Sequence, residues 1–281
     1  MKLMRVGPKG AEKPALMDAG GTIRDLSAHV RDIAGEVLSD AGLAKLRALD
    51  PATLPAVPAG ARIGACVGGI GKLCCVGLNY SDHAIETGNP IPEEPVLFGK
   101  AVTSVCGPND DTETPRGSDK LDYEVEIAIV IGKTAKNVSE ADAMSHVAGY
   151  AVFNDVSERT FQTQRGGQWV KGKSHDTFGP LGPWLVTRDE VPDPGNLAMF
   201  CDVNGERRQN GSTRTMIFGI AHIVSYISQF MTLHPGDVIP TGTPPGVALG
   251  MKPPKWLKPG DVVELGIEGL GTQRQTILPP N

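Results

Sequence analysis

The sequence lacks any run of 18 consecutive apolar residues, so we expect no helix that crosses a membrane. The charged residues near its start are not followed by an apolar stretch, which argues against a secretory signal peptide. An excess of positive charge is also missing, because 27 lysine and arginine residues face 32 aspartate and glutamate residues and leave a formal net charge of −5. Nucleic acids and anionic membranes are therefore poor partners for this protein.

Cysteine motifs are missing as well. The five cysteines contain no C-x-x-C pair and leave one residue over, which argues against a disulfide framework and against a zinc site made of cysteines. Reduced thiols are typical of a cytoplasmic protein, and this is the localisation that we expect. The residues are Cys66, Cys74, Cys75, Cys106 and Cys201.

Glycine (35 residues) and proline (23 residues) are abundant, which predicts many turns and short strands. Residues 1–60 are predicted to form a small α+β module that ends in a proline-rich linker, since three prolines fall between residues 50 and 60. Residues 61–281 are predicted to form the main domain. In the module we expect strands at Met4–Val6, Ala15–Met17 and Thr22–Asp25 and helical segments at Val30–Leu38 and Leu43–Leu49.

In the main domain, strand-like runs recur between turns, and one long amphipathic helix interrupts them. Apolar residues at steps of three and four predict this helix over Met216–Phe230, with Ser212 or Thr213 as its N-cap. Many strands with few helices favour an α+β class over alternating β-α-β units. The predicted strands are Leu73–Gly77, Val125–Ile131, Gly149–Asn154, Trp184–Thr187, Val238–Pro240 and Val262–Ile267.

The most informative strand begins with acidic residues. Glu124 and Glu126 lie on one face of it, about 6.5–7 Å apart along the backbone. Both faces become apolar further along the strand, which predicts that it is covered on both sides. Two buried carboxylates repel each other unless a cation neutralises them, and oxygen ligands of this kind suit Mg²⁺, Mn²⁺ or Ca²⁺. The alternative is a solvated strand face without a metal.

Asp155 follows a second apolar run and offers a third carboxylate. One interpretation makes it a metal ligand with Glu124 and Glu126; the other makes it the N-cap of a helix, in a capping box with Glu158. If Glu158 begins a short helix, Arg159 and Gln162 share one face of it and could bind an anionic substrate.

His83 and Glu86 are three residues apart, so on a helical turn the carboxylate would contact the imidazole and raise its basicity. The loop that follows, with prolines at 90, 92 and 95, has the composition of a mobile lid. A pair of this type is also common on protein surfaces without any function.

Residues Gly167–Ser174 match the P-loop pattern G-x-x-x-x-G-K-[ST]. A P-loop needs a buried strand before it and a helix after it, whereas the residues before this match are polar and two prolines follow it closely. A P-loop NTPase is therefore only a minor alternative. Lys173 could still hold a carboxylate or an enolate. A turn that contains Thr243 offers hydroxyl and amide groups, although it also fits an ordinary proline-glycine turn.

Together these residues resemble the fumarylacetoacetate hydrolase superfamily over about residues 72–275. The N-terminal module resembles that of bacterial members labelled ureidoglycolate lyase or 2,4-diketo-3-deoxy sugar acid hydrolase. The motifs that carry the resemblance are Gly77-Leu-Asn-Tyr-x-x-His83-x-x-Glu86, Asp122-Tyr-Glu124-Val-Glu126, Gly149-Tyr-x-x-x-Asn154-Asp155-Val-Ser-x-Arg159, Lys173-Ser-x-Asp176-Thr-Phe-Gly-Pro180-Leu-Gly-Pro183 and Pro235-Gly-Asp-Val-Ile-x-Thr-Gly-Thr-Pro-x-Gly246.

The resemblance implies a strand-rich catalytic domain, a mixed β-roll or β-sandwich, in a homodimer with bound Mg²⁺ (or Mn²⁺ or Ca²⁺). It implies hydrolysis of a C–C bond in a 2,4-dioxo acid, an acylpyruvate or a diketo-deoxy sugar acid, through a metal-stabilised enolate. Ureidoglycolate lyase, oxaloacetate decarboxylase and hydroxyheptadienedioate isomerase are alternatives. The implied roles are metal ligands for Glu124, Glu126 and Asp155, catalysis for His83, Glu86 and Lys173, and substrate binding for Arg159, Gln162 and Thr243.

Overall fold

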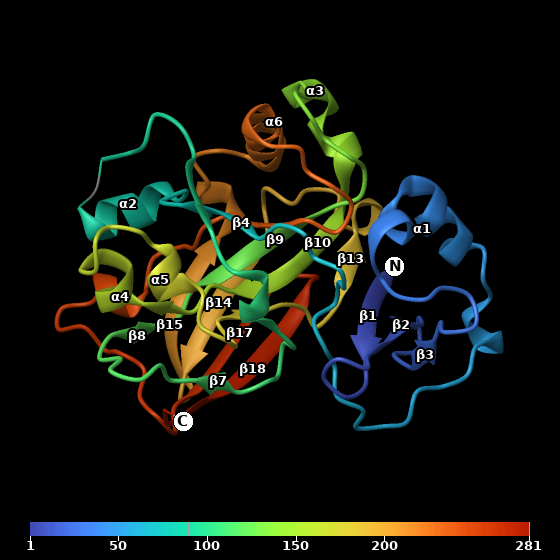
Figure 1. Cartoon of the computed structure of the whole chain (residues 1–281), viewed down its shortest axis with the longest axis horizontal. Helices are drawn as coiled ribbons and strands as arrows, with labels where there is room; N and C mark the ends of the chain where they lie inside the picture. Colours follow the sequence, from blue (N-terminus) through green and yellow to red (C-terminus); the bar gives the residue numbers. More distant parts are fainter. Residues whose placement is uncertain (89, 281) are drawn as a thin grey trace.

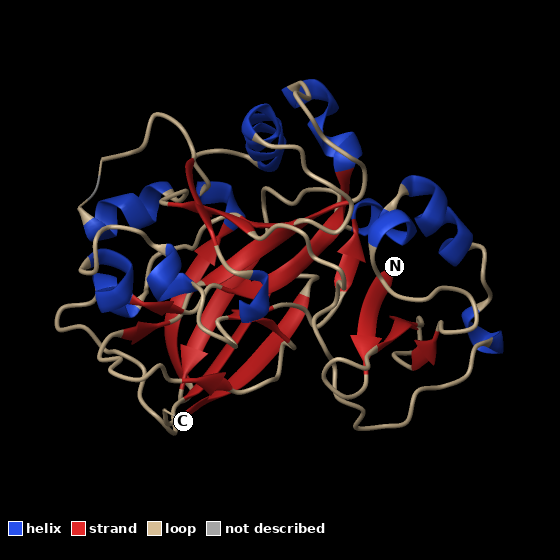
Figure 2. Ribbon diagram, in the orientation of Figure 1, coloured by secondary structure: helices blue, strands red, loops and turns tan. Residues whose placement is uncertain are grey.

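The computed structural model describes residues 1–88 and 90–280, and its strands gather in the middle of the molecule with most helices around them (Figure 2). The largest sheet has seven strands, and every neighbouring pair in it runs antiparallel. Their order is β16 (Val238–Pro240), β9 (Val125–Ile131), β10 (Val147–Asn154), β13 (Leu185–Thr187), β1 (Lys2–Val6), β2 (Lys13–Met17) and β3 (Ile23–Asp25).

A second sheet has five strands, and three further pairs complete the strand content of the described residues. The order of the five is β15 (Glu206–Ser212), β14 (Ala198–Val203), β17 (Val262–Ile267), β18 (Gly271–Leu278) and β7 (Thr112–Glu113), antiparallel except for β18 with β7. The pairs are β4 (Cys74–Gly77) with β5 (Val96–Gly99), β8 (Leu121–Asp122) with β11 (Ser157–Glu158), and the parallel β6 (Val105–Cys106) with β12 (Gly179–Pro180).

The helices are short and lie at the edges of the sheets (Figure 1). None in the described part of the chain is long and apolar enough to cross a membrane. The α-helices are α1 (Asp40–Arg47), α2 (Ser81–Thr87), α3 (Glu140–Ala143), α4 (Arg159–Thr163), α5 (Val170–Lys173) and α6 (Ile220–Phe230). Short 3-10 helices cover Gly35–Leu38, Pro51–Thr53, Val102–Ser104, Met144–His146, Arg188–Glu190, Thr213–Thr215 and Ala248–Gly250.

Strand β9 is buried along its whole length, which confirms the prediction that it is covered on both sides. Ile127 and Ile129 pack in a core with residues of the five-stranded sheet and of α6. Ala128 and Val130, on the other face, pack in a second core with residues of the N-terminal segment. This strand therefore lies between two cores, and its acidic end opens toward the site described below.

The N-terminal segment extends the large sheet, because β1 pairs with β13. The proline-rich stretch is held against β3: the amide of Val57 donates to the Ile23 carbonyl, and that of Asp25 donates to the Pro55 carbonyl, both at 2.8 Å. Of the predicted helical segment Val30–Leu38, only the 3-10 helix Gly35–Leu38 forms. The domain boundary near residue 60 stays a prediction.

Helix α6 ends at Phe230 as expected but begins four residues later than the apolar pattern predicts. Its N-cap is Gly219, and Ser212 instead caps the 3-10 helix Thr213–Thr215 by accepting a hydrogen bond from the amide of Arg214 at 3.2 Å. Ser212 is therefore an N-cap, as its residue type suggests, but of the 3-10 helix and not of α6.

We predict that Gly149→Ala weakens the junction between β10 and β13. A Cβ atom at this position would lie 2.1 Å from the carbonyl oxygen of Val186, closer than real Cβ contacts, so the two strands would have to separate. We expect the free energy of unfolding to fall by about 1–3 kcal/mol, measured by urea denaturation. The control is Gly99→Ala in β5, where nothing lies within 4 Å of the added atom. Equal unfolding midpoints for the two variants would contradict the prediction.

Candidate active site

Elements that are far apart in the sequence meet around one cavity of about 250 Å³. Strand β4 and helix α2 form one side of it, helices α4 and α5 another, and the loop after β16 a third. Its floor is the edge where β9 begins and β10 ends, which antiparallel pairing brings together, with Asn154 opposite Val125. Side chains at this edge are therefore fixed by strand register.

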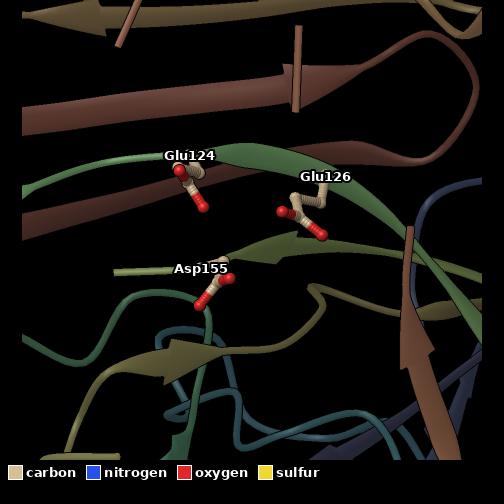
Figure 3. A group of neighbouring side chains, drawn as sticks. All are labelled: Glu124, Glu126 and Asp155. Atoms are coloured by element: carbon tan, nitrogen blue, oxygen red, sulfur yellow. The ribbon is translucent and has the colours of Figure 1, made fainter. Parts of the chain in front are cut away.

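Three carboxylates converge at this edge, as the sequence predicts. Glu124 precedes β9, Glu126 lies within it, and Asp155 follows β10. The amide of Asp155 donates to the Glu124 carbonyl at 2.9 Å, which fixes the two chain segments side by side. All three side chains are buried, and one oxygen of each lies within 4.8 Å of the others. Figure 3 shows the three side chains gathered where these two segments run side by side.

Asp155 is not the N-cap of the following helix, so that alternative is wrong. Its oxygens are bound by lysines, whereas Glu158 caps α4 by accepting from the amide of Phe161 at 2.6 Å. The expected pair on α4 does form, because Arg159 Nη1 donates to Gln162 Oε1 at 3.0 Å. At this junction between strand and helix, Asp155 therefore belongs to the site and Glu158 caps the helix.

Three buried cations accompany the carboxylates. Lys173 Nζ lies 2.7 Å from Glu124 Oε2 and 2.6 Å from Asp155 Oδ2. Arg159 Nη2 lies 2.5 Å from Glu124 Oε1. Lys100 binds the other oxygen of Asp155 and donates to a backbone carbonyl at 3.1 Å. Lys100 was missed in the sequence, because a single lysine after a short strand carries no distinguishing pattern.

This arrangement separates the acidities of the two glutamates. Burial alone would raise the pKa of Glu124, but the charges of Arg159 and Lys173 outweigh it and hold that pKa below its usual value. Burial, reinforced by the charges of Asp155 and Glu124, raises the pKa of Glu126 well above its usual value. Burial also lowers the pKa of Lys100, more than the adjacent Asp155 raises it. The three cations thus form ion pairs with Glu124 and Asp155 but not with Glu126.

The donor set fits a hard divalent cation. All three groups are carboxylates, which are the ligands that Mg²⁺, Mn²⁺ and Ca²⁺ prefer. Glu126 has no ion pair among the described residues, and the partner that the structure gives it is the amide of Gly242 at 2.8 Å. A bound divalent cation would therefore neutralise Glu126, which has no other cationic partner among the described residues. Glu124, Glu126 and Asp155 are the residues that would hold this cation.

His83 and Glu86 meet on α2, as their spacing predicts, with 2.9 Å between His83 Nδ1 and Glu86 Oε2. The other oxygen of Glu86 accepts from the amide of Gly246 at 2.9 Å, so the helix is fastened to the loop after β16. His83 is 6% exposed and lines the cavity. With Nδ1 held by the carboxylate, Nε2 is the ring nitrogen left to act on a bound molecule.

Two glutamines that no sequence pattern singled out hold the site from behind. Gln209 on β15 accepts from the amide of Val125 at 3.0 Å and donates to the hydroxyl of Thr243 at 2.8 Å. Gln275 on β18 accepts from Asn154 at 2.9 Å, and Asn154 in turn accepts from the amide of Glu124 at 3.2 Å. Thr243 lines the cavity, but its hydroxyl also donates to a backbone carbonyl, so it belongs to the framework as well.

The segment Gly167–Ser174 does not fold as a P-loop. Helix α4 and a turn precede it instead of a strand, and its lysine ends α5 instead of beginning a helix. Lys173 is directed to two carboxylates rather than to a loop that could hold phosphates. These contacts leave no structural support for nucleotide binding at this match.

Comparisons with known proteins agree with this geometry. The family model described as fumarylacetoacetate (FAA) hydrolase C-terminal matches residues 72–278. A protein of Burkholderia multivorans named "Putative hydrolase" is 64% identical over 276 residues, 98% of each chain. Fumarylacetoacetate hydrolase from psychrophilic Exiguobacterium antarcticum is 36% identical with a TM-score of 0.85 over 99% of each chain. Maleylpyruvate hydrolase from Sphingobium sp. SYK-6, solved with manganese(II) and pyruvate, is 28% identical with a TM-score of 0.83 over 100% of each chain.

We predict that Glu126→Gln abolishes stabilisation by a divalent cation. A cation present at about 100 times its Kd should stabilise the unmodified protein by about 2.7 kcal/mol, which differential scanning fluorimetry detects as a rise in Tm. The amide keeps the shape of the side chain but removes the charge that would bind the metal. The control is Glu264→Gln, an exposed position on β17. The same Mg²⁺- or Mn²⁺-induced rise in Glu126→Gln would remove this residue from the metal site.

Proposed function

The chain belongs to the fumarylacetoacetate hydrolase family, and from this premise we propose that it is a divalent-metal-dependent hydrolase that cleaves a C–C bond in a 2,4-dioxo acid, either an acylpyruvate or a diketo-deoxy sugar acid. One observation carries the proposal: a buried carboxylate group fit for a metal, a lysine and a His–Glu pair border the same cavity. A binding protein without chemistry would have no use for a paired imidazole beside such a group.

The 2-oxo acid end of the substrate would bind at the carboxylate edge. A divalent cation held by Glu124, Glu126 and Asp155 would supply Lewis-acid stabilisation of negative charge on the keto oxygen. Arg159 and Gln162 lie beside this edge, hydrogen-bonded to each other and both lining the cavity. They would orient the substrate carboxylate, since a guanidinium and an amide offer donors in fixed directions.

His83 would be the general base. Its Nε2 would take a proton from water as the oxygen adds to the C4 carbonyl, while Glu86 holds the tautomer and stabilises the imidazolium. The C3–C4 bond then breaks, its electron pair passes to C3 as the enolate of the pyruvate portion, and C4 leaves as a carboxylic acid. Lys173, buried beside the same edge, would stabilise the enolate charge until C3 is protonated.

Decarboxylation of oxaloacetate, isomerisation of a dienoate and cleavage of ureidoglycolate are alternatives, because they would use the same polar end of the site. Decarboxylation differs from hydrolysis in that it needs no activated water. The orientation of His83 by Glu86, and the fastening of Glu86 to Gly246, favour a reaction that needs a positioned base.

The proposal places the enzyme in the cytoplasm as a homodimer with small 2-oxo acids as its partners. All five cysteines are free and buried, which is in keeping with a reducing compartment. The net charge of −5 disfavours association with nucleic acids and anionic membranes.

We predict that His83→Ala lowers kcat for acylpyruvate hydrolysis by roughly 10²–10⁴-fold, because water is no longer deprotonated as it attacks. Glu86→Gln should cost less, since Glu86 only positions the imidazole. Oxaloacetate decarboxylation by the same variants should fall less than hydrolysis does. The measurement is steady-state kinetics on both substrates, with exposed His29→Ala as the control and the metal-induced rise in Tm as proof that the metal still binds. Full hydrolytic activity in His83→Ala would exclude the His–Glu pair from the mechanism.

A further inference from the structure

The cavity is charged at its floor and apolar along its sides. Leu78, Phe98, Trp169 and Leu249 line it together with the charged groups described above. Resting on the proposed hydrolysis of 2,4-dioxo acids, we propose that the acyl arm beyond C4 is uncharged. The enzyme would then act on monoanionic acids and discriminate against those that carry a second, terminal carboxylate.

The cavity offers no spare cation to a second carboxylate. Among the described residues that line it, only Arg159 and Lys173 are positively charged. Arg159 donates to Asp122, Glu124 and Gln162, and Lys173 lies between Glu124 and Asp155, so both cations are held at the carboxylate edge, where the 2-oxo acid end would bind. A distal carboxylate would therefore lie against the apolar walls without a cationic partner, which is costly wherever the charge is removed from water.

The apolar side walls come from several separate parts of the chain. Phe98 and Trp169 pack with ring centroids 5.2 Å apart, and Phe98 also lies 5.1 Å from Lys173 Nζ, so this wall begins directly beside the charged floor. Leu249, 44% exposed, contributes from the loop after β16. Leu78 also lines the cavity. Its backbone φ of +52° is unfavourable for a bulky residue, and strained conformations of this kind are typical of functional sites.

Two exposed cations on the segment from α4 to α5 do not line the cavity. Arg165 stacks on the ring of Phe161 at 4.0 Å, and Lys171 donates to the carbonyl of Arg165 at 2.7 Å. The segment of residues 81–95, which begins with α2, contains four acidic residues and no lysine or arginine in its sequence. Ile85 on this segment is 78% exposed. This segment therefore offers no lysine or arginine to a second carboxylate.

The test uses two substrates of equal length, 2,4-dioxoheptanoate and 2,4-dioxoheptanedioate, which differ only in a terminal methyl or carboxylate group. We expect kcat/KM to be at least about 100-fold higher for the monoacid, since an unpaired charge is rejected far more strongly than a missing methylene. Equal values, or a preference for the diacid, would overturn the inference and leave the proposed function standing. Hydrolysis of neither substrate, and of no diketo-deoxy sugar acid assayed beside them, would instead overturn the proposed function.

Binding provides a second readout that does not depend on turnover. The inert acids 2-oxoheptanoate and 2-oxoheptanedioate lack the C4 keto group and cannot be cleaved. Isothermal titration calorimetry with the metal-loaded protein should show tighter binding of the monoacid. Equal affinities would contradict the inference independently of any kinetic result.

A gain of function tests the wall itself. Leu249→Arg places a cation at the partly exposed side of the cavity, whereas Leu249→Met changes the side chain without adding charge. The ratio of kcat/KM for the diacid to that for the monoacid should rise at least about tenfold in the arginine variant and stay within about twofold in the methionine variant. An unchanged ratio in a Leu249→Arg protein that unfolds at the wild-type midpoint would contradict discrimination at this wall.

Discussion

The antiparallel pairing of β9 with β10 is the constraint on which the rest of the site depends. Because Asn154 lies opposite Val125, the chain enters β9 and leaves β10 at the same edge of the sheet, and the three carboxylates meet there. A register shift of one residue would turn Glu126 toward the opposite core and separate it from Asp155. Both faces of β9 are packed in apolar cores, so such a shift would also exchange the side chains that each core receives from this strand.

This arrangement buries several charged side chains, and neighbouring residues stabilise them. Like charges in a low-dielectric interior repel strongly, so the carboxylates are tied to Lys100, Arg159 and Lys173 by direct ion pairs. Gln209 and Gln275 then fix the backbone of the acidic segment from β15 and β18. The five-stranded sheet therefore positions the site as well as packing against the core.

Local patterns in the sequence predicted the acidic strand, the His–Glu turn and most buried strands, because each depends on the spacing of a few neighbouring residues. They did not reveal β15 or β18, whose sequences are largely polar and show no apolar alternation. Gln273 is buried because it donates to the carbonyls of Val152 and Gly182, partners about 120 and 90 residues away in the chain. A buried glutamine of this kind looks like a surface residue until its distant partners are known.

The carboxylate edge and the apolar walls of the cavity differ in how tightly they are tied to the rest of the fold. The carboxylate edge is set by strand register and by a shared network of ion pairs, so altering one member leaves another charge unpaired. Leu249 and Trp169 lie outside regular strands, in a 3-10 helix and just before α5, and neither side chain makes an ion pair or a hydrogen bond in the described structure. Leu249 is also 44% exposed, so its substitution disturbs few other contacts. The carboxylate edge is therefore fixed by the sheets, whereas Leu249 and Trp169 belong to the segments that border them.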